Sequence, residues 1–229
     1  MAAKLVLYML AISLSNQLCG INAVLTYADL ILVEARVPLQ SQVAGLAIFV
    51  LMLLSTLVST PLIRSVNRRP LLATSLGICS LSLVCLAVFF HLCPESSSDH
   101  DNSSGASLVL LVCLIAYIIS FSLGMGPLCF ILLSDFSLPR LASLAGTVTG
   151  LTMWSSCGLV TYAFPLLEVA LGRIMNDFNF LIFFLEVALG RAAVFSGFAI
   201  CSAAGSAFAL LVLPETRGRS GAEVEAAMQ

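Results

Sequence analysis

Charged side chains are scarce in this sequence. Asp, Glu, Lys and Arg make up 10% of its 229 residues, whereas hydrophobic residues make up 60%. A water-soluble domain of this length could not keep so large an apolar fraction away from water, so the composition predicts a polytopic membrane protein. The formal net charge of −2 is too small to indicate a nucleic-acid partner, and we expect none.

Histidine is also rare, and the usual catalytic and metal-binding motifs are absent. The only two histidines, His91 and His100, lie in or near one loop, and the sequence contains no HExxH motif and no pair of aspartates on facing apolar runs. These absences argue against an intramembrane enzyme. The eight cysteines include no CxxC pair, so we interpret them as small packing residues and expect neither a metal site nor a cofactor.

Long apolar runs are what the sequence has instead. A helix that spans a bilayer needs about 20 predominantly apolar residues, and six runs satisfy this length. We therefore predict that residues 1–229 form an all-α polytopic membrane protein, a single bundle of six transmembrane helices whose last residues, 214–229, are a cytoplasmic tail. The expected helices are 5–28, 42–63, 70–92, 107–133, 142–166 and 192–213.

The basic residues give the bundle an orientation. Six crossings place both termini on the same side of the membrane, and seven of the ten Lys and Arg residues then fall on the side of the N-terminus. This bias predicts that both termini are cytoplasmic, and we expect a multi-pass protein of the plasma membrane. The inner basic residues are Lys4, Arg64, Arg68, Arg69, Arg140, Arg217 and Arg219, and the outer ones are Arg36, Arg173 and Arg191.

A short duplicated segment does not fit the pattern of six simple membrane spans. The heptapeptide LEVALGR occurs at 167–173 and again at 185–191, which makes 167–191 an atypical outer segment. The apolar residues 178–190 are too few to span a bilayer and include Glu186. They are expected to form either an interfacial helix or an extension of a neighbouring helix.

Three amide side chains lie inside the first apolar run, in the stretch NQLCGINA. On an ideal helical wheel Asn16, Gly20 and Tyr27 share one face, whereas Gln17 and Asn22 do not. Unwinding or bending near Gly20, where no Cβ restricts the backbone, would let all these side chains face one cavity. Broken helices of this kind line midplane substrate sites in transporters.

Neutral amides both donate and accept hydrogen bonds, which suits the hydroxyl groups of a sugar or another polyol. A charged substrate would call for a charged residue near the middle of the membrane, and the apolar runs contain almost none. The alternative is that the amides hydrogen-bond neighbouring helices, at about 0.6 kcal/mol each on average. Residue chemistry alone leaves both interpretations open.

Two further features lie in the later apolar runs. The stretch SLGMGPL at 122–128 contains Gly124, Gly126 and Pro127, which weaken the helical hydrogen-bond ladder and predict a kink that could act as a hinge. Trp154 is the only tryptophan and lies in the middle of a predicted span, away from the interfaces that tryptophan favours. It is expected either to stack on a sugar ring or to fill space.

Opposite charges follow several of the predicted helices on the inner side. They could form an ion-pair network that closes this side of the bundle, or the arginines could serve only to set the topology. The residues concerned are Arg68, Arg69, Asp135, Arg140, Glu215 and Arg217.

Taken jointly, five motifs resemble those of the facilitative sugar transporters of the major facilitator superfamily. Residues 16–23 are similar to the Q-Q-L-S-G-x-N-A motif of the seventh helix, and 67–69 to the G-R-R that follows the eighth. Residues 126–127 resemble the kinked stretch of the tenth helix and 153–154 the x-W of the eleventh. Residues 214–219, PETRGR, are similar to the closing P-E-T-K-G-R.

The resemblance implies the carboxy-terminal six-helix half of such a transporter, working by facilitated diffusion of glucose or fructose through alternating access. It implies that Gln17 and Asn22 hydrogen-bond sugar hydroxyls, with Asn16 in the place of the family's first Gln and Trp154 near the sugar. The residues Tyr27-Ala28-Asp29 resemble the fructose- and urate-type branch.

The sequence also departs from the family pattern. Met52 replaces the usual Asn of the eighth helix, Phe130 stands where glucose-type members have Trp, and Arg64 stands where an acid is usual. The resemblance further implies that these 229 residues have no counterpart of the amino-terminal half, which supplies the opposite wall of the cavity. We therefore expect either self-association or pairing with an amino-terminal half, or else a transport-inactive fragment or a regulatory subunit of another transporter.

Overall fold

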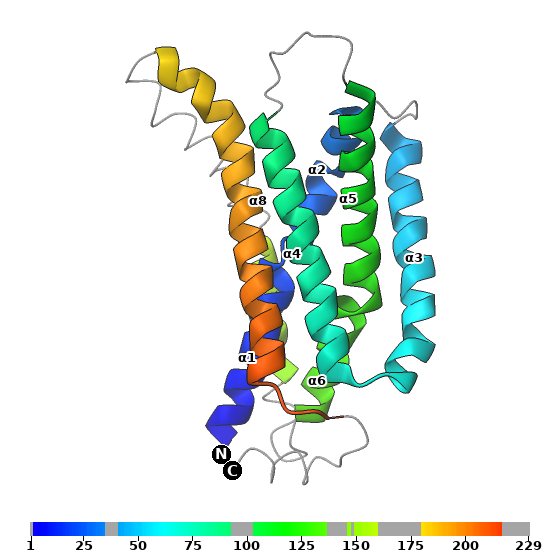
Figure 1. The fold of residues 1–229 in the computed structure, drawn as a ribbon. Helices are drawn as coiled ribbons and strands as arrows, with labels where there is room; N and C mark the ends of the chain where they lie inside the picture. Colours follow the sequence, from blue (N-terminus) through cyan, green and yellow to red (C-terminus); the bar gives the residue numbers. More distant parts are fainter. Residues whose placement is uncertain are drawn as a thin grey trace.

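A computed structural model describes residues 2–34, 41–92, 103–136, 146–147, 149–159 and 180–216. The regular structure in these residues is helical, and the long helices run roughly side by side (Figure 1). The helices are α1 (Ala2–Leu18), α2 (Ile21–Glu34), α3 (Ser41–Ser65), α4 (Arg68–Leu92), α5 (Ser103–Leu123), α6 (Met125–Phe136) and α8 (Phe180–Leu211).

Five stretches of the described residues are long and apolar enough to cross a membrane. Helices suit this task because hydrocarbon offers no partner for backbone N–H and C=O groups, so each segment must pair its own. The sixth expected helix, 142–166, is described only at 146–147 and 149–159, where it is helical. The five stretches are Val6–Leu25, Gly45–Ser65, Arg68–His91, Leu108–Leu133 and Val194–Leu211.

Two of the runs expected to form single helices are each divided in two. The run 5–28 contains most of α1 and the first part of α2, with Cys19 and Gly20 between them. The run 107–133 contains most of α5 and α6, with Gly124 between them. Both divisions fall at a glycine, where the missing Cβ makes a change of backbone direction least costly.

The last helix is longer than the sequence predicted. Helix α8 begins at Phe180 and includes the second LEVALGR copy, 185–191, whereas its stretch that is long and apolar enough to cross a membrane is Val194–Leu211, close to the expected 192–213. Of the two expectations for 178–190, the extension of a neighbouring helix therefore holds from Phe180 onwards. The first copy, 167–173, lies outside the described residues. A helix need not end at the membrane surface, so counting apolar residues underestimated its length.

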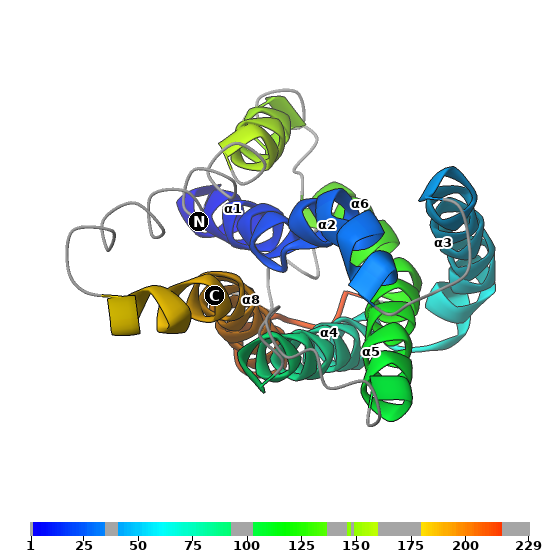
Figure 2. The ribbon, with the colours of Figure 1, turned by 90° about the horizontal axis from the view of Figure 1, so that it is seen from above.

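Helix α4 is the central element of the bundle. It packs most extensively against α8 on one side and α5 on the other (Figure 2). The interfaces contain fully buried side chains such as Leu76, Leu83 and Tyr117. Serine side chains add hydrogen bonds between α4 and α8, with Ser80 Oγ donating to Ala199 O at 2.8 Å and Ser206 Oγ donating to Ala73 O at 2.8 Å.

Helix α3 lies at the edge of this arrangement and exposes much of its apolar side (Figure 2). Its exposed residues recur every three to four positions and include Leu46, Phe49, Leu53 and Leu57. This spacing places them on one face of the helix. An apolar face of this size suits contact with lipid.

Candidate functional site

The break between α1 and α2 is built around Gly20. Its φ of 84° lies in the left-handed region, which only glycine adopts routinely. The N–H of Gly20 donates to Gln17 O at 3.1 Å and its carbonyl accepts from Val24 N at 2.9 Å. The chain therefore leaves one helix and enters the next within two residues.

The break brings two amide side chains together. Asn22 Nδ2 donates to Gln17 Oε1 at 2.7 Å, although the two residues are five positions apart and lie on different faces of an ideal helix. Gln17 is buried and Asn22 is half-buried. Unwinding at Gly20, which the sequence suggested as the way to bring these amides together, is what the structure contains.

Asn16, the residue before Gln17 in α1, is also buried. Its Oδ1 atom has no hydrogen-bond partner among the described residues, and only 3% of the residue is exposed. A buried amide oxygen without a partner costs about 1–3 kcal/mol. Asn16 Oδ1 could therefore accept a hydrogen bond from a hydroxyl group that reached it.

Neighbouring helices hold the break in place. Tyr117 of α5 donates its hydroxyl to Cys19 O at 2.9 Å, and Cys19 Sγ donates to Asn16 O at 2.9 Å. The ring of Phe198 in α8 lies directly against Gly20, because a Cβ at this glycine would be only 2.7 Å from Phe198 Cγ. These contacts supply partners for backbone carbonyls that the interrupted helix leaves unpaired.

Two further residues, Tyr27 and Trp154, were predicted to bind the substrate. Tyr27 belongs to α2, but its side chain lies outside the described part of the chain. Trp154 is 77% exposed and lies in the helical residues 149–159. Figure 2 places this segment, drawn in yellow-green, on the opposite side of α1 from the α4–α8 pair.

A second break separates α5 from α6 at Gly124. Serines of neighbouring helices pair the backbone groups around it: Ser75 Oγ donates to Ser120 O at 2.8 Å and accepts from Met125 N at 3.1 Å, and Ser59 Oγ donates to Leu123 O at 2.6 Å. The predicted kink is thus present and its position is Gly124.

The other two predicted hinge residues lie in the first turn of α6. Gly126 and Pro127 follow Met125, at which the helix begins. Proline suits this place because the first N–H groups of a helix have no intrahelical partner, so the missing N–H costs little.

Charged groups meet at the end of the bundle where α4 begins. Arg68 Nη1 forms an ion pair with Asp135 Oδ2 near the end of α6. The Glu215 carboxylate accepts the backbone N–H groups of Arg68 at 3.1 Å and of Arg69 at 3.2 Å. A carboxylate at a helix N-terminus pairs unsatisfied donors and interacts favourably with the helix dipole.

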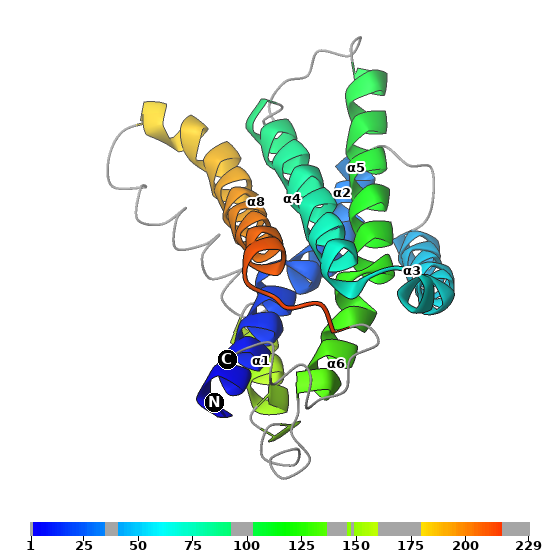
Figure 3. The ribbon, with the colours of Figure 1, turned by 60° about the horizontal axis from the view of Figure 1, so that its bottom comes forward.

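The residues that follow α8 complete this charged cluster. They run from the end of α8 towards α6 (Figure 3), so that Thr216 Oγ1 accepts a hydrogen bond from Arg68 Nη1 at 3.2 Å. Arg69 Nη2 donates to the backbone oxygen of Leu210. Thr216 and this backbone oxygen were not predicted, because neither carries a charge that the sequence would reveal.

Four of the six charged residues expected here are therefore brought together. Arg68, Arg69, Asp135 and Glu215 join α4, α6 and the segment after α8. Arg140 and Arg217 lie outside the described residues.

The ion pair between Arg68 and Asp135 should stabilise the bundle. The two side chains are only 21% and 24% exposed, so solvent screens them less than a surface pair. In a double-mutant cycle with Arg68→Ala and Asp135→Ala, we expect a coupling energy of about 0.5–3 kcal/mol. Unfolding in detergent would measure it, and strictly additive losses would show that the pair contributes nothing.

Grooves between helices mark the surface of the described residues. One lies between α4 and α8, and another is bounded by residues of α3, α4 and α5. Gln17 and Asn22 line neither groove. The amide pair is thus a buried polar site at a helix break rather than the wall of either groove.

Comparison with known proteins decides the family. The sequence model described as "Sugar (and other) transporter" matches residues 2–228. The chain belongs to this family. The resemblance seen in the five motifs therefore extends over almost the whole length of the chain.

Curated relatives carry the names of sugar transporters. The chain is 33% identical to mouse "Solute carrier family 2, facilitated glucose transporter member 7", over 93% of this chain and 36% of the relative. It is 30% identical to Arabidopsis thaliana "Sugar transporter ERD6-like 6", over 92% and 39%. It is 27% identical to Bombyx mori "Facilitated trehalose transporter Tret1", over 96% and 39%. The chain thus spans between a third and two fifths of these relatives.

Solved structures show the same fold. A double-tryptophan mutant of XylE superimposes with a TM-score of 0.75 at 20% identity, covering 98% of this chain and 43% of that one. XylE bound to 6-bromo-6-deoxy-D-glucose, titled a proton:xylose symporter of the major facilitator superfamily, gives a TM-score of 0.72. The expected fold class, an all-α polytopic membrane protein similar to half of a major facilitator transporter, is confirmed. The expectation that the chain is not an enzyme is confirmed as well, because its relatives are transporters.

Proposed function

We propose that this chain forms one wall of the substrate site in a facilitated-diffusion transporter for a hexose, glucose or fructose. The observation that carries the proposal is the Gln17–Asn22 amide pair at the Gly20 break. It is preceded in α1 by Asn16, whose buried Oδ1 has no partner among the described residues. Amides that hydrogen-bond each other can exchange that bond for bonds to sugar hydroxyls. Tyr27 of α2 and Trp154 of the segment 149–159 would also contact the sugar.

Alternating access requires a second six-helix unit on the other side of the site. The occupant of that position is proposed to be an amino-terminal transporter half or a second copy of this chain. The curated relatives are longer than the chain, which is in line with such a partner. The transporter would lie in the plasma membrane with both termini in the cytoplasm, as the arginine distribution favours.

The charged cluster around Arg68 would serve as the inner gate. Arg68, Asp135 and Glu215 tie the start of α4 to α6 and to the end of α8. Closing the cytoplasmic side would preserve these contacts and opening it would break some of them. Gly20 and Gly124 would act as hinges, because each joins two helices through one or two residues.

The first test is the effect of Gln17→Ala on hexose binding. Losing one hydrogen bond, at about 0.5–1.5 kcal/mol, should weaken binding roughly two- to twelvefold. Cys19→Ala is the matched control, since it alters the same break but leaves both amides and the Tyr117 hydrogen bond to the Cys19 backbone oxygen. Binding to the purified chain by tryptophan fluorescence or calorimetry would provide the measurement. Equal effects of the two substitutions would favour amides that only tie helices together.

Uptake of labelled hexose by proteoliposomes that contain only this chain distinguishes a transporter from a transport-inactive fragment or a regulatory subunit. Saturable uptake of labelled glucose or fructose that is lost in Gln17→Ala would support a self-associating transporter. No uptake by protein shown to be folded would favour a transport-inactive fragment or a regulatory subunit that pairs with another transporter half.

A further inference from the structure

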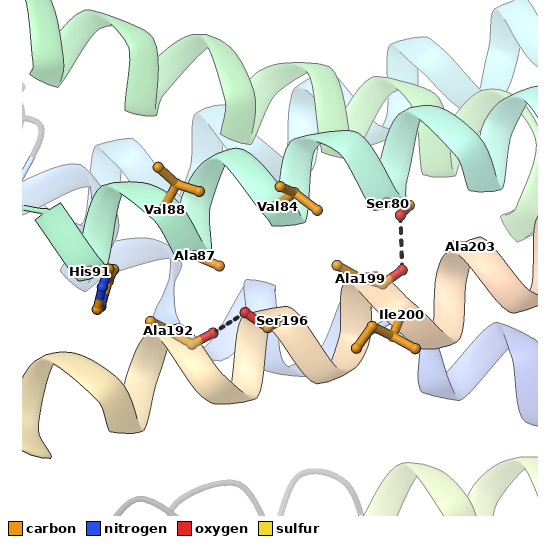
Figure 4. A pocket seen from close by; sticks show the side chains of 10 residues that line it. All are labelled: Ser80, Val84, Ala87, Val88, His91, Ala192, Ser196, Ala199, Ile200 and Ala203. Atoms are coloured by element: carbon orange, nitrogen blue, oxygen red, sulfur yellow. Dashed lines mark hydrogen bonds between the residues drawn. The ribbon is translucent and has the colours of Figure 1, made fainter.

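A long groove of about 460 Å³ runs between α4 and α8. Figure 4 shows its walls, which extend from Ser80 to His91 on α4 and from Ala203 to Ala192 on α8. Helix α1 lies behind the two helices in this view. The groove therefore opens on the face of the α4–α8 pair away from α1 and from the amide pair.

The chemistry of the walls is almost purely hydrocarbon. The groove's two serine hydroxyls are already engaged, since Ser80 Oγ donates to Ala199 O at 2.8 Å and Ser196 Oγ donates to Ala192 O at 2.7 Å (dashed in Figure 4). A sugar or another polyol would have to desolvate its hydroxyl groups here with little compensation, which is costly. An apolar occupant has no such cost.

The position of the groove along α4 matches one leaflet of a bilayer. Helix α4 has 25 residues, about 37 Å at 1.5 Å per residue, enough to cross the roughly 30 Å of hydrocarbon. Ser80 is the middle residue of this helix and His91 precedes its last residue. The groove thus extends about 16 Å from one end of the span to its midpoint.

The groove is continuous with the surface that faces lipid. Its rim includes Val84 and Val88 of α4 and Ile200 of α8, all exposed. In a multi-pass membrane protein, the apolar surface at this depth meets hydrocarbon rather than water. His91, also exposed, lies at the end of the groove and of the candidate span Arg68–His91. Headgroups would begin at this level, and the imidazole can donate a hydrogen bond to an ester or phosphate oxygen.

We propose that this groove binds one acyl chain of a phospholipid from the leaflet at the His91 end of α4, with the headgroup beside His91. The alanines of the α8 wall, Ala192, Ala199 and Ala203, let a linear chain approach the helix closely. The bound chain fills the space between two helices that otherwise pack together through small residues. The site is separate from the proposed sugar site.

The proposal is tested by measuring which lipids the purified chain retains and which of its peptides a photoreactive lipid labels. Native mass spectrometry from detergent should detect one retained phospholipid per chain. In nanodiscs that contain phosphatidylcholine with a diazirine in the acyl chain, peptides covering 84–91 and 192–203 should be labelled at least fivefold more than the exposed face of α3. Equal labelling of the two surfaces, or retention of a sterol or free fatty acid instead, would overturn the proposal.

Neighbouring alanines provide a matched pair of variants. Ala203 lines the groove and Ala204 does not, although both are exposed. Ala203→Phe should lower groove labelling at least fivefold and abolish lipid retention, whereas Ala204→Phe should leave both unchanged. Ile200→Trp, at an exposed rim position that tolerates a large side chain, should act like Ala203→Phe. Wild-type labelling and retention in both groove variants would show that the groove binds no lipid chain.

Discussion

Gly20→Val should destabilise the bundle more than any other single glycine substitution near the amide pair. A non-glycine residue in the left-handed region costs about 1–2 kcal/mol, and Gly20 has a φ of 84°. The new side chain would also collide with Phe198, whose Cγ would lie 2.7 Å from the added Cβ. With overpacking at about 1–3 kcal/mol, we expect a total loss of about 2–5 kcal/mol.

Unfolding by SDS titration in mixed micelles, together with the yield of monodisperse protein, measures this loss. Gly197→Val is the matched control, because a Cβ at Gly197 meets no atom within 4 Å and valine is a better helix former than glycine. An unfolding midpoint for Gly20→Val equal to that of wild type would contradict the left-handed break.

A double variant separates the two causes. In Gly20→Ala/Phe198→Ala the ring that collides with the new Cβ is absent, but the backbone conformation remains unfavourable for alanine. We expect partial recovery of the unfolding midpoint relative to Gly20→Ala alone, after correction for the loss caused by Phe198→Ala. No recovery would assign the whole effect to backbone strain.

Gly124→Ala should have the second largest effect, for a different reason. The added Cβ would lie 2.3 Å from Ser75 Cβ and 2.5 Å from Ser75 Oγ, and a Cβ atom cannot rotate out of the way. Helices α4 and α5 would have to separate, which would strain the Ser75 hydrogen bonds to Ser120 O and Met125 N. Overpacking and two weakened hydrogen bonds together predict a loss of about 2–5 kcal/mol.

Gly77→Ala on α4 is the control for this prediction. A Cβ there meets only Ser206 Oγ, at the ordinary contact distance of 3.7 Å, and alanine favours the helix by about 1 kcal/mol. The two variants should therefore shift the unfolding midpoint in opposite directions. After correction for the loss caused by Ser75→Gly alone, adding Ser75→Gly to Gly124→Ala should recover the part due to collision. If no stability is recovered after that correction, the collision is not the cause.

The two breaks show how far the sequence predicts local structure. The apolar runs and the glycines within them indicated helices that bend near Gly20 and near Gly124, Gly126 and Pro127, because glycine and proline weaken the helical ladder. Which glycine forms the second break depends on Ser75, a residue of another helix that pairs the released backbone groups. Local sequence carries no information about that contact.

The amide site likewise combines a feature that the sequence reveals with contacts that only the tertiary structure supplies. Three amides in a hydrocarbon-like run indicated a polar site, since such groups are costly in a membrane. An ideal helical wheel, however, places Gln17 and Asn22 on different faces, and only the unwound residues between α1 and α2 let Asn22 Nδ2 reach Gln17 Oε1. The side chains that support this break, Tyr117 and Phe198, are distant in sequence.

The sequence by itself determined that the chain is a membrane protein, where its apolar runs lie, which family motifs it carries and which charged residues lie at helix ends. These properties follow from local chemistry, because each run must satisfy its own backbone in hydrocarbon. Tertiary structure decided the partners: Arg68 with Asp135, Glu215 with the start of α4, and the groove between α4 and α8. Such pairings depend on how helices far apart in the chain pack against one another, and no local sequence pattern specifies that packing.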